Sequence, residues 1–143
     1  MAANVSPIFL LTPNNASDGA TGMAPTILTA TGDYTGVSAN HAQVFKANTN
    51  GSWIERLRFK ANSTNIATVA RVYINNGSTH TTATNNSFYD EITLPAITAT
   101  NTAATATIDL PMQFFMASGW TIWVGLATTV ANGWVVSAIG GDY

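Results

Sequence analysis

The residues suited to catalysis or metal binding are few and far apart. The sequence has no cysteine and two histidines, His41 and His80, and neither histidine stands at a spacing typical of metal ligands. The lack of cysteine excludes disulfides, thiolate metal sites and thiol nucleophiles. We therefore expect both histidines to lie in loops or on the surface, and we expect no metal and no cofactor.

The carboxylates do not form an acid–base pair in the sequence. Asp90 and Glu91 are adjacent, so in a strand their side chains point to opposite faces. Glu55 lies among apolar residues and, if buried, would be a candidate functional acid. We expect instead a structural ion pair with Arg71 on a neighbouring strand. No serine stands in a nucleophile-elbow pattern and no glycine-rich phosphate loop carries a lysine, so we predict that the protein is not an enzyme.

The composition predicts a polar but weakly charged surface. Charged residues make up only 8% of the chain, against about 25% in a typical domain, and Thr, Ala, Asn, Ser and Gly take their place. Such a surface suits a small all-β domain with threonine-rich outer faces. It also suits a protein whose surface faces other protein, because interface cores are depleted in charge. We favour the second interpretation.

Several partners and locations are disfavoured by charge and hydropathy. The net charge of −2 gives no global field that would attract nucleic acid or an anionic membrane. No stretch approaches the ~18 consecutive apolar residues of a membrane-spanning helix. Residues 1–15 lack a basic region, and their apolar run is too short for a secretory signal. We therefore predict no nucleic-acid partner, no membrane partner and no export by the general secretory route.

Residues 51–77 are the stretch on which the predicted fold is built. From Trp53 onward, apolar and basic side chains alternate, as expected for a strand with one covered face. Alternation resumes over residues 69–74 after a polar turn, and Asn76-Gly77 tolerates the positive φ of a tight reversal. We predict a β-hairpin. Its first strand has an apolar set, Trp53, Glu55, Leu57, Phe59 and Ala61, and an opposite set, Ile54, Arg56, Arg58 and Lys60.

The rest of the chain continues in short strands. Turn signals separate further candidates at 26–31, 42–46, 88–94, 105–112, 120–126 and 134–139. No stretch longer than two turns shows a helical period. Seven or eight short strands at this spacing favour an antiparallel sandwich or barrel. We predict an all-β, jelly-roll-like antiparallel β-sandwich over residues 26–143.

An extended N-terminal arm over residues 1–25 precedes the predicted sandwich. Three prolines and several turn-like dipeptides punctuate it. Its apolar patch, Ile8, Phe9, Leu10 and Leu11, would pack either on the chain's own domain or along a neighbouring subunit. Both alternatives stay open at the level of the sequence.

Two surface patterns have more than one interpretation. Arg56, Arg58 and Lys60 form a basic stripe that could contact nucleic acid, but an inter-subunit salt bridge or a solvated face is the favoured role. Tryptophans could stack on sugars, but in a small β-domain they more often fill a core or an interface. They stand at Trp53, Trp120, Trp123 and Trp134.

Residues 45–143 resemble small structural proteins of tailed-bacteriophage virions, in particular capsid decoration (cement) proteins. The resemblance lies in the runs GSWIERLRFKA, NIATVARVYINNG, FYDEITLPA, GWTIWVGLAT and NGWVVSAIGGDY. It implies a β-sandwich that is made in the host cytoplasm and sits on the capsid surface. It also implies a homo-oligomer, most simply a trimer, that binds the major capsid protein and clamps the shell.

The resemblance and the composition together suggest which residues make interfaces. We expect them to be Ile8, Phe9, Leu10, Leu11, Arg56, Arg58, Trp123 and Tyr143. Two other functions stay open. One is a glycan- or host-binding module of a fibre or tail, and the other is a structural subunit of the tail or neck.

Overall fold

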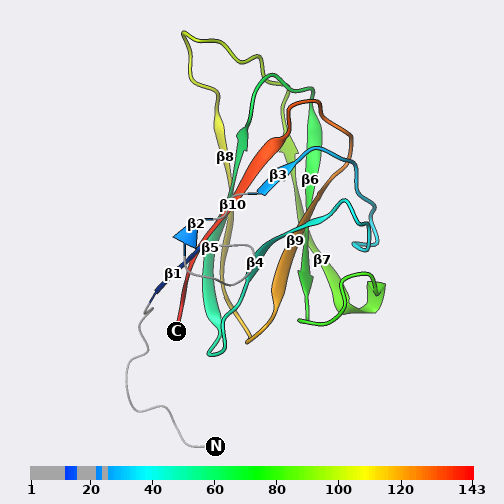
Figure 1. Ribbon diagram of the computed structural model, residues 1–143, viewed down its shortest axis with the longest axis vertical. Helices are drawn as coiled ribbons and strands as arrows, with labels where there is room; N and C mark the ends of the chain where they lie inside the picture. The colour runs from blue at the N-terminus through cyan, green and yellow to red at the C-terminus, as the bar shows by residue number, and fades with distance from the viewer. Residues whose placement is uncertain (1–11, 16–21, 24–25) are drawn as a thin grey trace, which may run out of the picture.

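The computed structural model describes residues 12–15, 22–23 and 26–143, so the apolar patch at residues 8–11 lies outside the described residues. Its strands form two sheets packed face to face (Figure 1). Sheet A has the order β2-β1-β10-β5-β8, with β3 also paired to β10, and sheet B has the order β4-β9-β6-β7. The elements are β1 (Thr12–Asn15), β2 (Gly22–Met23), β3 (Thr26–Leu28), β4 (Ala42–Lys46), β5 (Ser52–Ala61), β6 (Thr68–Asn75), the 3-10 turn η1 (Ala83–Asn85), β7 (Asn86–Leu94), β8 (Thr107–Met116), β9 (Thr121–Leu126) and β10 (Trp134–Asp142).

The strand pairs are nested, which makes the sandwich a jelly roll. β6 pairs with β7, β5 with β8, β4 with β9 and β3 with β10, all antiparallel. Pairing of β5 with β10 and of β6 with β9 then joins these ribbons into the two sheets. The predicted all-β, jelly-roll-like sandwich is confirmed. No helix in the described part of the chain is long and apolar enough to cross a lipid bilayer.

The predicted hairpin over residues 51–77 is wrong in its pairing. Its two strands, β5 and β6, exist, but they belong to different sheets and the loop at 62–67 carries the chain from one layer to the other. Both strands still alternate, because each has one face on the shared core. Leu57 and Phe59 of β5 and Val72 of β6 are fully buried. Alternation of apolar and polar residues indicates that one face of a strand is buried, but it does not indicate which strand is the pairing partner.

A bulge in β5 changes which side chains enter the core. The register with β10 shifts between Ile54 and Arg56, which leaves Glu55 as the extra residue. The register with β8 shifts at the same point, where Glu55 stands against Met112 and Gln113. Leu57 and Phe59 point inward as predicted, but before the bulge the inward residue is Ile54, which is fully buried. Trp53 and Glu55, which the strict alternation places inside, are therefore displaced to the outer face of sheet A.

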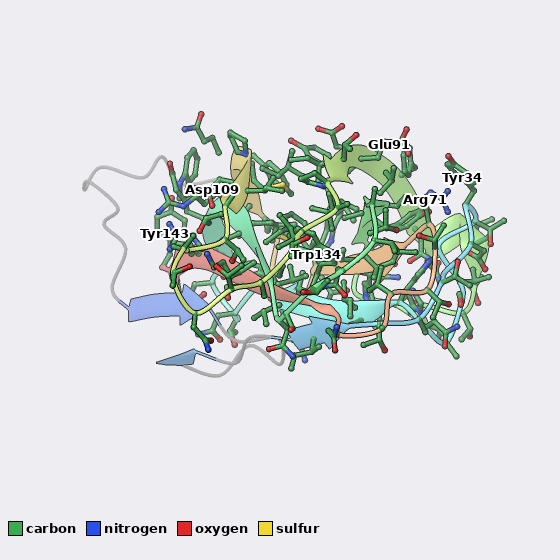
Figure 2. All side chains as sticks on the ribbon, turned by 90° about the horizontal axis from the view of Figure 1, so that it is seen from above. Tyr34, Arg71, Glu91, Asp109, Trp134 and Tyr143 are labelled. Carbon is green, nitrogen blue, oxygen red and sulfur yellow. The ribbon has the colours of Figure 1, made fainter. Side chains whose placement is uncertain are left out.

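The core is a continuous apolar layer between the sheets. Trp134, at the start of β10, is fully buried and lies between the two layers in Figure 2. The strands of both sheets contribute to this layer. Its largest fully buried apolar side chains, besides Trp134, are Phe45, Ile54, Leu57, Phe59, Leu94, Met116, Ile122 and Leu126.

The free side of β10 is shared by two short strands. β3 pairs with its first residues, Trp134 to Val136, and β1 pairs with its last residues, Gly140 to Asp142. The described residues of the N-terminal arm therefore extend the sheet of their own chain. This arrangement favours the interpretation that this part of the arm packs on its own domain.

Gly140 is required by a close backbone approach. A Cβ atom at this position would lie 2.3 Å from the Trp53 carbonyl oxygen, next to the bulge. Gly140→Ala must therefore push β10 away from β5, and we expect a loss of about 1–3 kcal/mol in the free energy of unfolding. Chemical denaturation of this variant and of Ser137→Ala, which adds no atom to the same strand, measures the effect. Equal denaturation midpoints for Gly140→Ala and the wild type would contradict it.

Candidate interaction surfaces

Three positive side chains of β5 line the outer face of sheet A. We call Arg56, Arg58 and Lys60 the basic row. Asp109, which faces Arg58 across the β5–β8 pair, lies 3.3 Å from Arg58 Nε and 3.8 Å from Arg56 Nε. Lys60 Nζ donates a hydrogen bond to the Thr105 carbonyl. The arginines are about two-fifths exposed, so these pairs contribute little to stability, about 0–1 kcal/mol each, and are available to a partner.

The same face ends in aromatic side chains at the bulge. We call Trp53, Phe115 and Tyr143 the aromatic end. Trp53 and Phe115 are directly opposite each other in the β5–β8 pair, and the rings of Phe115 and Tyr143 have centroids 5.6 Å apart. Phe115 is 53% exposed. Exposure of a large apolar ring beside two others gives a patch of the kind that contacts other molecules.

A carboxylate is held beside the aromatic end. Glu55 accepts hydrogen bonds from Trp53 Nε1 at 3.2 Å and from Gln113 Nε2 at 3.3 Å. These bonds lower the pKa of Glu55 below its ordinary value, so the side chain is ionised at neutral pH. Gln113 has a φ of 53°, a left-handed conformation that is uncommon for a residue other than glycine. The bulge and this strained residue together position the Glu55 carboxylate.

The predicted Glu55–Arg71 ion pair is wrong, because the two residues belong to different sheets. Arg71 instead lies 3.9 Å from Glu91 of β7, measured from Nε to Oε2. The ring of Tyr34 covers its guanidinium, with the Cζ atom 3.4 Å from the ring centroid, a cation–π contact. Figure 2 shows Tyr34, Arg71 and Glu91 grouped at a distance from Asp109 and Tyr143.

The free edge of sheet B carries acidic and aromatic side chains. β7 is the terminal strand in the order of this sheet, and most of its residues are exposed. We call Phe88, Tyr89, Asp90 and Glu91 the acidic edge. Phe88 is 49% exposed and Tyr89 is 40% exposed. Tyr89 also reaches toward sheet A, where its ring centroid lies 5.4 Å from that of Phe114.

The outer face of sheet B is covered by aromatic and imidazole rings. His41 was predicted to lie in a loop or on the surface, and it does lie in the loop before β4. This loop folds back over the sheet, so the His41 side chain is fully buried and stacks on Tyr73. His80, in the β6–β7 loop, stacks on Trp123 with ring centroids 3.8 Å apart.

The four tryptophans do not share one surface. Trp134 is in the core, Trp123 lies under His80, Trp53 belongs to the aromatic end, and Trp120 is 40% exposed at the β8–β9 turn. A sugar-binding patch built from several tryptophans is therefore not assembled. Their positions suit the roles of core and interface residues.

Two further features bear on chemistry. No group of three or more His, Cys, Asp or Glu residues among those described is arranged to hold a metal ion. A hollow of about 650 Å³ lies between the loops at one end of the sandwich, and none of its lining side chains ionises. It is lined by Thr64, Asn65, Ile66, Ala96, Ile97, Thr98, Thr129, Ala131 and Asn132.

Of the predicted interface residues, Arg56, Arg58 and Tyr143 come together on the outer face of sheet A. Trp123 lies on the opposite face, and the patch at residues 8–11 lies outside the described residues. Phe115 and Asp109 were missed, although Phe114-Phe115 at the end of an alternating strand signals that one phenylalanine must face outward. Comparisons of the chain with protein-family models, curated proteins and solved structures found no match. The resemblance to phage virion proteins therefore stays a prediction.

The environment of Glu55 can be tested by its titration. Trp53→Phe removes the indole N–H, the largest cause of the lowered pKa of Glu55, so this pKa should rise toward its ordinary value of 4.5. An NMR titration of the Glu55 side-chain carboxyl carbon measures it, with Trp120→Phe as the matched control. An unchanged Glu55 pKa in Trp53→Phe would mean that the indole bond does not hold the carboxylate.

Proposed function

We propose that this protein is a structural component of a bacteriophage virion, a capsid decoration (cement) protein that self-associates and binds the major capsid protein. The observation that carries the proposal is the outer face of sheet A, where the basic row and the aromatic end form one exposed surface. In a chain with only 8% charged residues, this face gathers three of the five basic residues beside exposed aromatic rings.

The chemistry of this face favours contact with protein. Full burial of a phenylalanine-sized side chain is worth about 1.5–3 kcal/mol, and Phe115 leaves about half of its surface exposed in the single chain. Aromatic residues and arginine are the types enriched in protein–protein interfaces. Two arginines on a rigid strand, already oriented by Asp109, lose little conformational freedom when a partner binds.

The acidic edge provides a complementary surface for a second copy of the chain. Asp90, which is exposed at this edge, would meet the basic row of a neighbour, and the exposed rings of Phe88 and Tyr89 would add apolar contact. The two surfaces are different, so the contact is heterologous, and a heterologous contact whose rotation closes gives a ring such as a trimer. Two adjacent carboxylates on β7 also disfavour pairing of this edge with another β7, because like charges would lie across from each other.

Charge exchange tests this self-association. Arg58→Glu places like charges at the proposed contact and should weaken association about tenfold or more, equivalent to ~1.4 kcal/mol. Asp90→Lys should do the same, and the double variant should restore association because the charges are again complementary. Native mass spectrometry across a dilution series measures the oligomer, with Thr102→Glu as a control at an exposed loop position.

The outcomes separate self-association itself from the choice of the contact surfaces. A wild-type chain that stays monomeric at every concentration would contradict self-association. An oligomer that persists in both single variants would show that other surfaces hold the copies together.

Binding to the shell is tested at the aromatic end. Phe115→Ala removes the exposed ring and should reduce co-sedimentation with assembled shells of the major capsid protein at least tenfold. The free energy of unfolding of the variant should be unchanged. Ile66→Ala is the matched control, because Ile66 is 62% exposed on a loop at the other end of β5. Wild-type binding by Phe115→Ala would exclude the aromatic end from the capsid contact.

A further inference from the structure

A row of stacked rings lies on the outer face of sheet B. His41 stacks on Tyr73 with ring centroids 5.1 Å apart and planes 21° apart. His80 meets His41 edge-on at 5.7 Å and stacks on Trp123 at 3.8 Å. We call these four residues the imidazole stack. It joins three parts of the chain, because Tyr73 and Trp123 belong to sheet B while the two histidines come from separate loops.

The segment 29–41, which we call the cover, is tied to sheet B through this stack. The Gly32 amide donates to the Leu126 carbonyl at 2.7 Å, and Tyr73 Oη donates to the Asp33 carbonyl at 2.8 Å. His41, at the end of the cover, is the side chain that it buries most completely. The packing of His41 therefore helps to hold the cover against the sheet, together with the Asn86 side chain, which donates to the Gly36 carbonyl, and the contact of Tyr34 with Arg71.

The site of His41 fits a neutral ring closely and gives the ring nitrogens no hydrogen-bond partner from the described part of the chain. Cβ atoms at Gly32 and Gly125 would lie 2.2 and 2.1 Å from the ring, so only glycine on either side leaves room for it. Neither ring nitrogen has a hydrogen-bond partner among the described residues, and Nε2 of His80 is likewise buried without one. An apolar ring would avoid the cost of these unpaired groups, about 1–3 kcal/mol each, so a histidine here requires another explanation.

We propose that the cover is an acid-sensitive device, which lies closed over sheet B while His41 and His80 are neutral and detaches when they are protonated. Two imidazolium ions with centroids 5.7 Å apart would repel each other, and one of them, His41, is fully buried. Opening the cover would hydrate both rings and relieve this repulsion. The device is on the face opposite the basic row and borders the acidic edge, where the Phe88 ring packs on Tyr34 and Tyr73. Its test reads the cover of the single chain and does not use self-association or capsid binding.

The charged groups around the imidazole stack do not offset the repulsion between two protonated histidines. Asp33 Oδ1 lies 4.0 Å from His41 Nε2, beyond hydrogen-bond distance, and the Asp33 side chain is 41% exposed. On β6, burial raises the pKa of Tyr73, so its hydroxyl stays neutral at any pH of interest. Arg71 of β6 and Glu91 of β7, which also face Tyr73, are paired with each other. One partly solvated carboxylate thus faces two imidazoles.

The pKa shift of His80 agrees with a closed state that favours the neutral imidazole. Burial, and then the proximity of His41, lowers the pKa of His80 below its ordinary value. Burial alone would raise the pKa of Asp33, but hydrogen bonds from Thr35 and from the Gly36 and Val37 amides, with His41 nearby, lower it overall. Since the folded pKa of His80 is depressed, its contribution to stability is complete above about pH 6.5 and is lost as the pH falls below that value.

Amide hydrogen exchange of the full-length chain tests the device. The Gly32 amide reports the cover and the Val72 amide reports the core, each as a protection factor corrected for the intrinsic exchange rate. Since the closed state disfavours protonation of His80, Gly32 protection should fall by up to about tenfold at about pH 5.5, relative to about pH 7.5, while Val72 stays protected. In His41→Phe/His80→Phe, whose rings cannot titrate, Gly32 protection should not change with pH.

Several results would overturn the proposal. One is constant Gly32 protection in the wild type down to about pH 5, and another is an equal loss in the double variant. If the larger ring at position 41 prevents folding, His80→Phe alone keeps the stack on Trp123 and should make the loss of Gly32 protection smaller than in the wild type. Full wild-type sensitivity in His80→Phe would overturn the paired-imidazole mechanism.

Discussion

The antiparallel pairing of β5 with β10 is the contact on which the rest of the sandwich depends. It joins the outer ribbon β3–β10 to the ribbon β5–β8 and so creates sheet A. The bulge at Glu55 interrupts this pairing once, and Gly140 allows the two backbones to meet there. From this irregularity follow the burial of Ile54, the exposure of Trp53 and the position of the Glu55 carboxylate.

The two outer faces of the molecule differ in how they use a small number of charges. Sheet A presents arginines and aromatic rings to solvent on a rigid strand, which suits a permanent contact with another protein. Sheet B buries His41 and Tyr73 beneath a loop, and its exposed acidic side chains lie at the β7 edge. Under the two proposals above, the molecule binds protein through the outer face of sheet A, and the outer face of sheet B responds to pH.

The sequence predicted the strands and the class of fold because alternation depends only on a strand having one covered face. It did not predict that β5 and β6 belong to different sheets, since a sheet-crossing loop and a hairpin turn both need polar residues between two alternating strands. Nor did strict alternation predict the outward position of Trp53, because one inserted residue reverses every earlier side chain. The loop position of His41 was predicted, but its burial was not, since that burial depends on Gly32 and Gly125, which meet it only in the folded chain.

The nested order of the strand pairs also affects the order in which these pairs form during folding. The β6–β7 ribbon joins neighbours in sequence, whereas Leu28 must meet Trp134 for β3 to pair with β10. Closing such a long loop costs more entropy than closing a short one, and folds dominated by distant pairings form slowly. We expect assembly to proceed outward from β6–β7, with the ends of the chain joining last. Until then, one edge of β10 is unpaired and open to another molecule. Pairing of β3 and β1 with this edge then prevents intermolecular strand pairing.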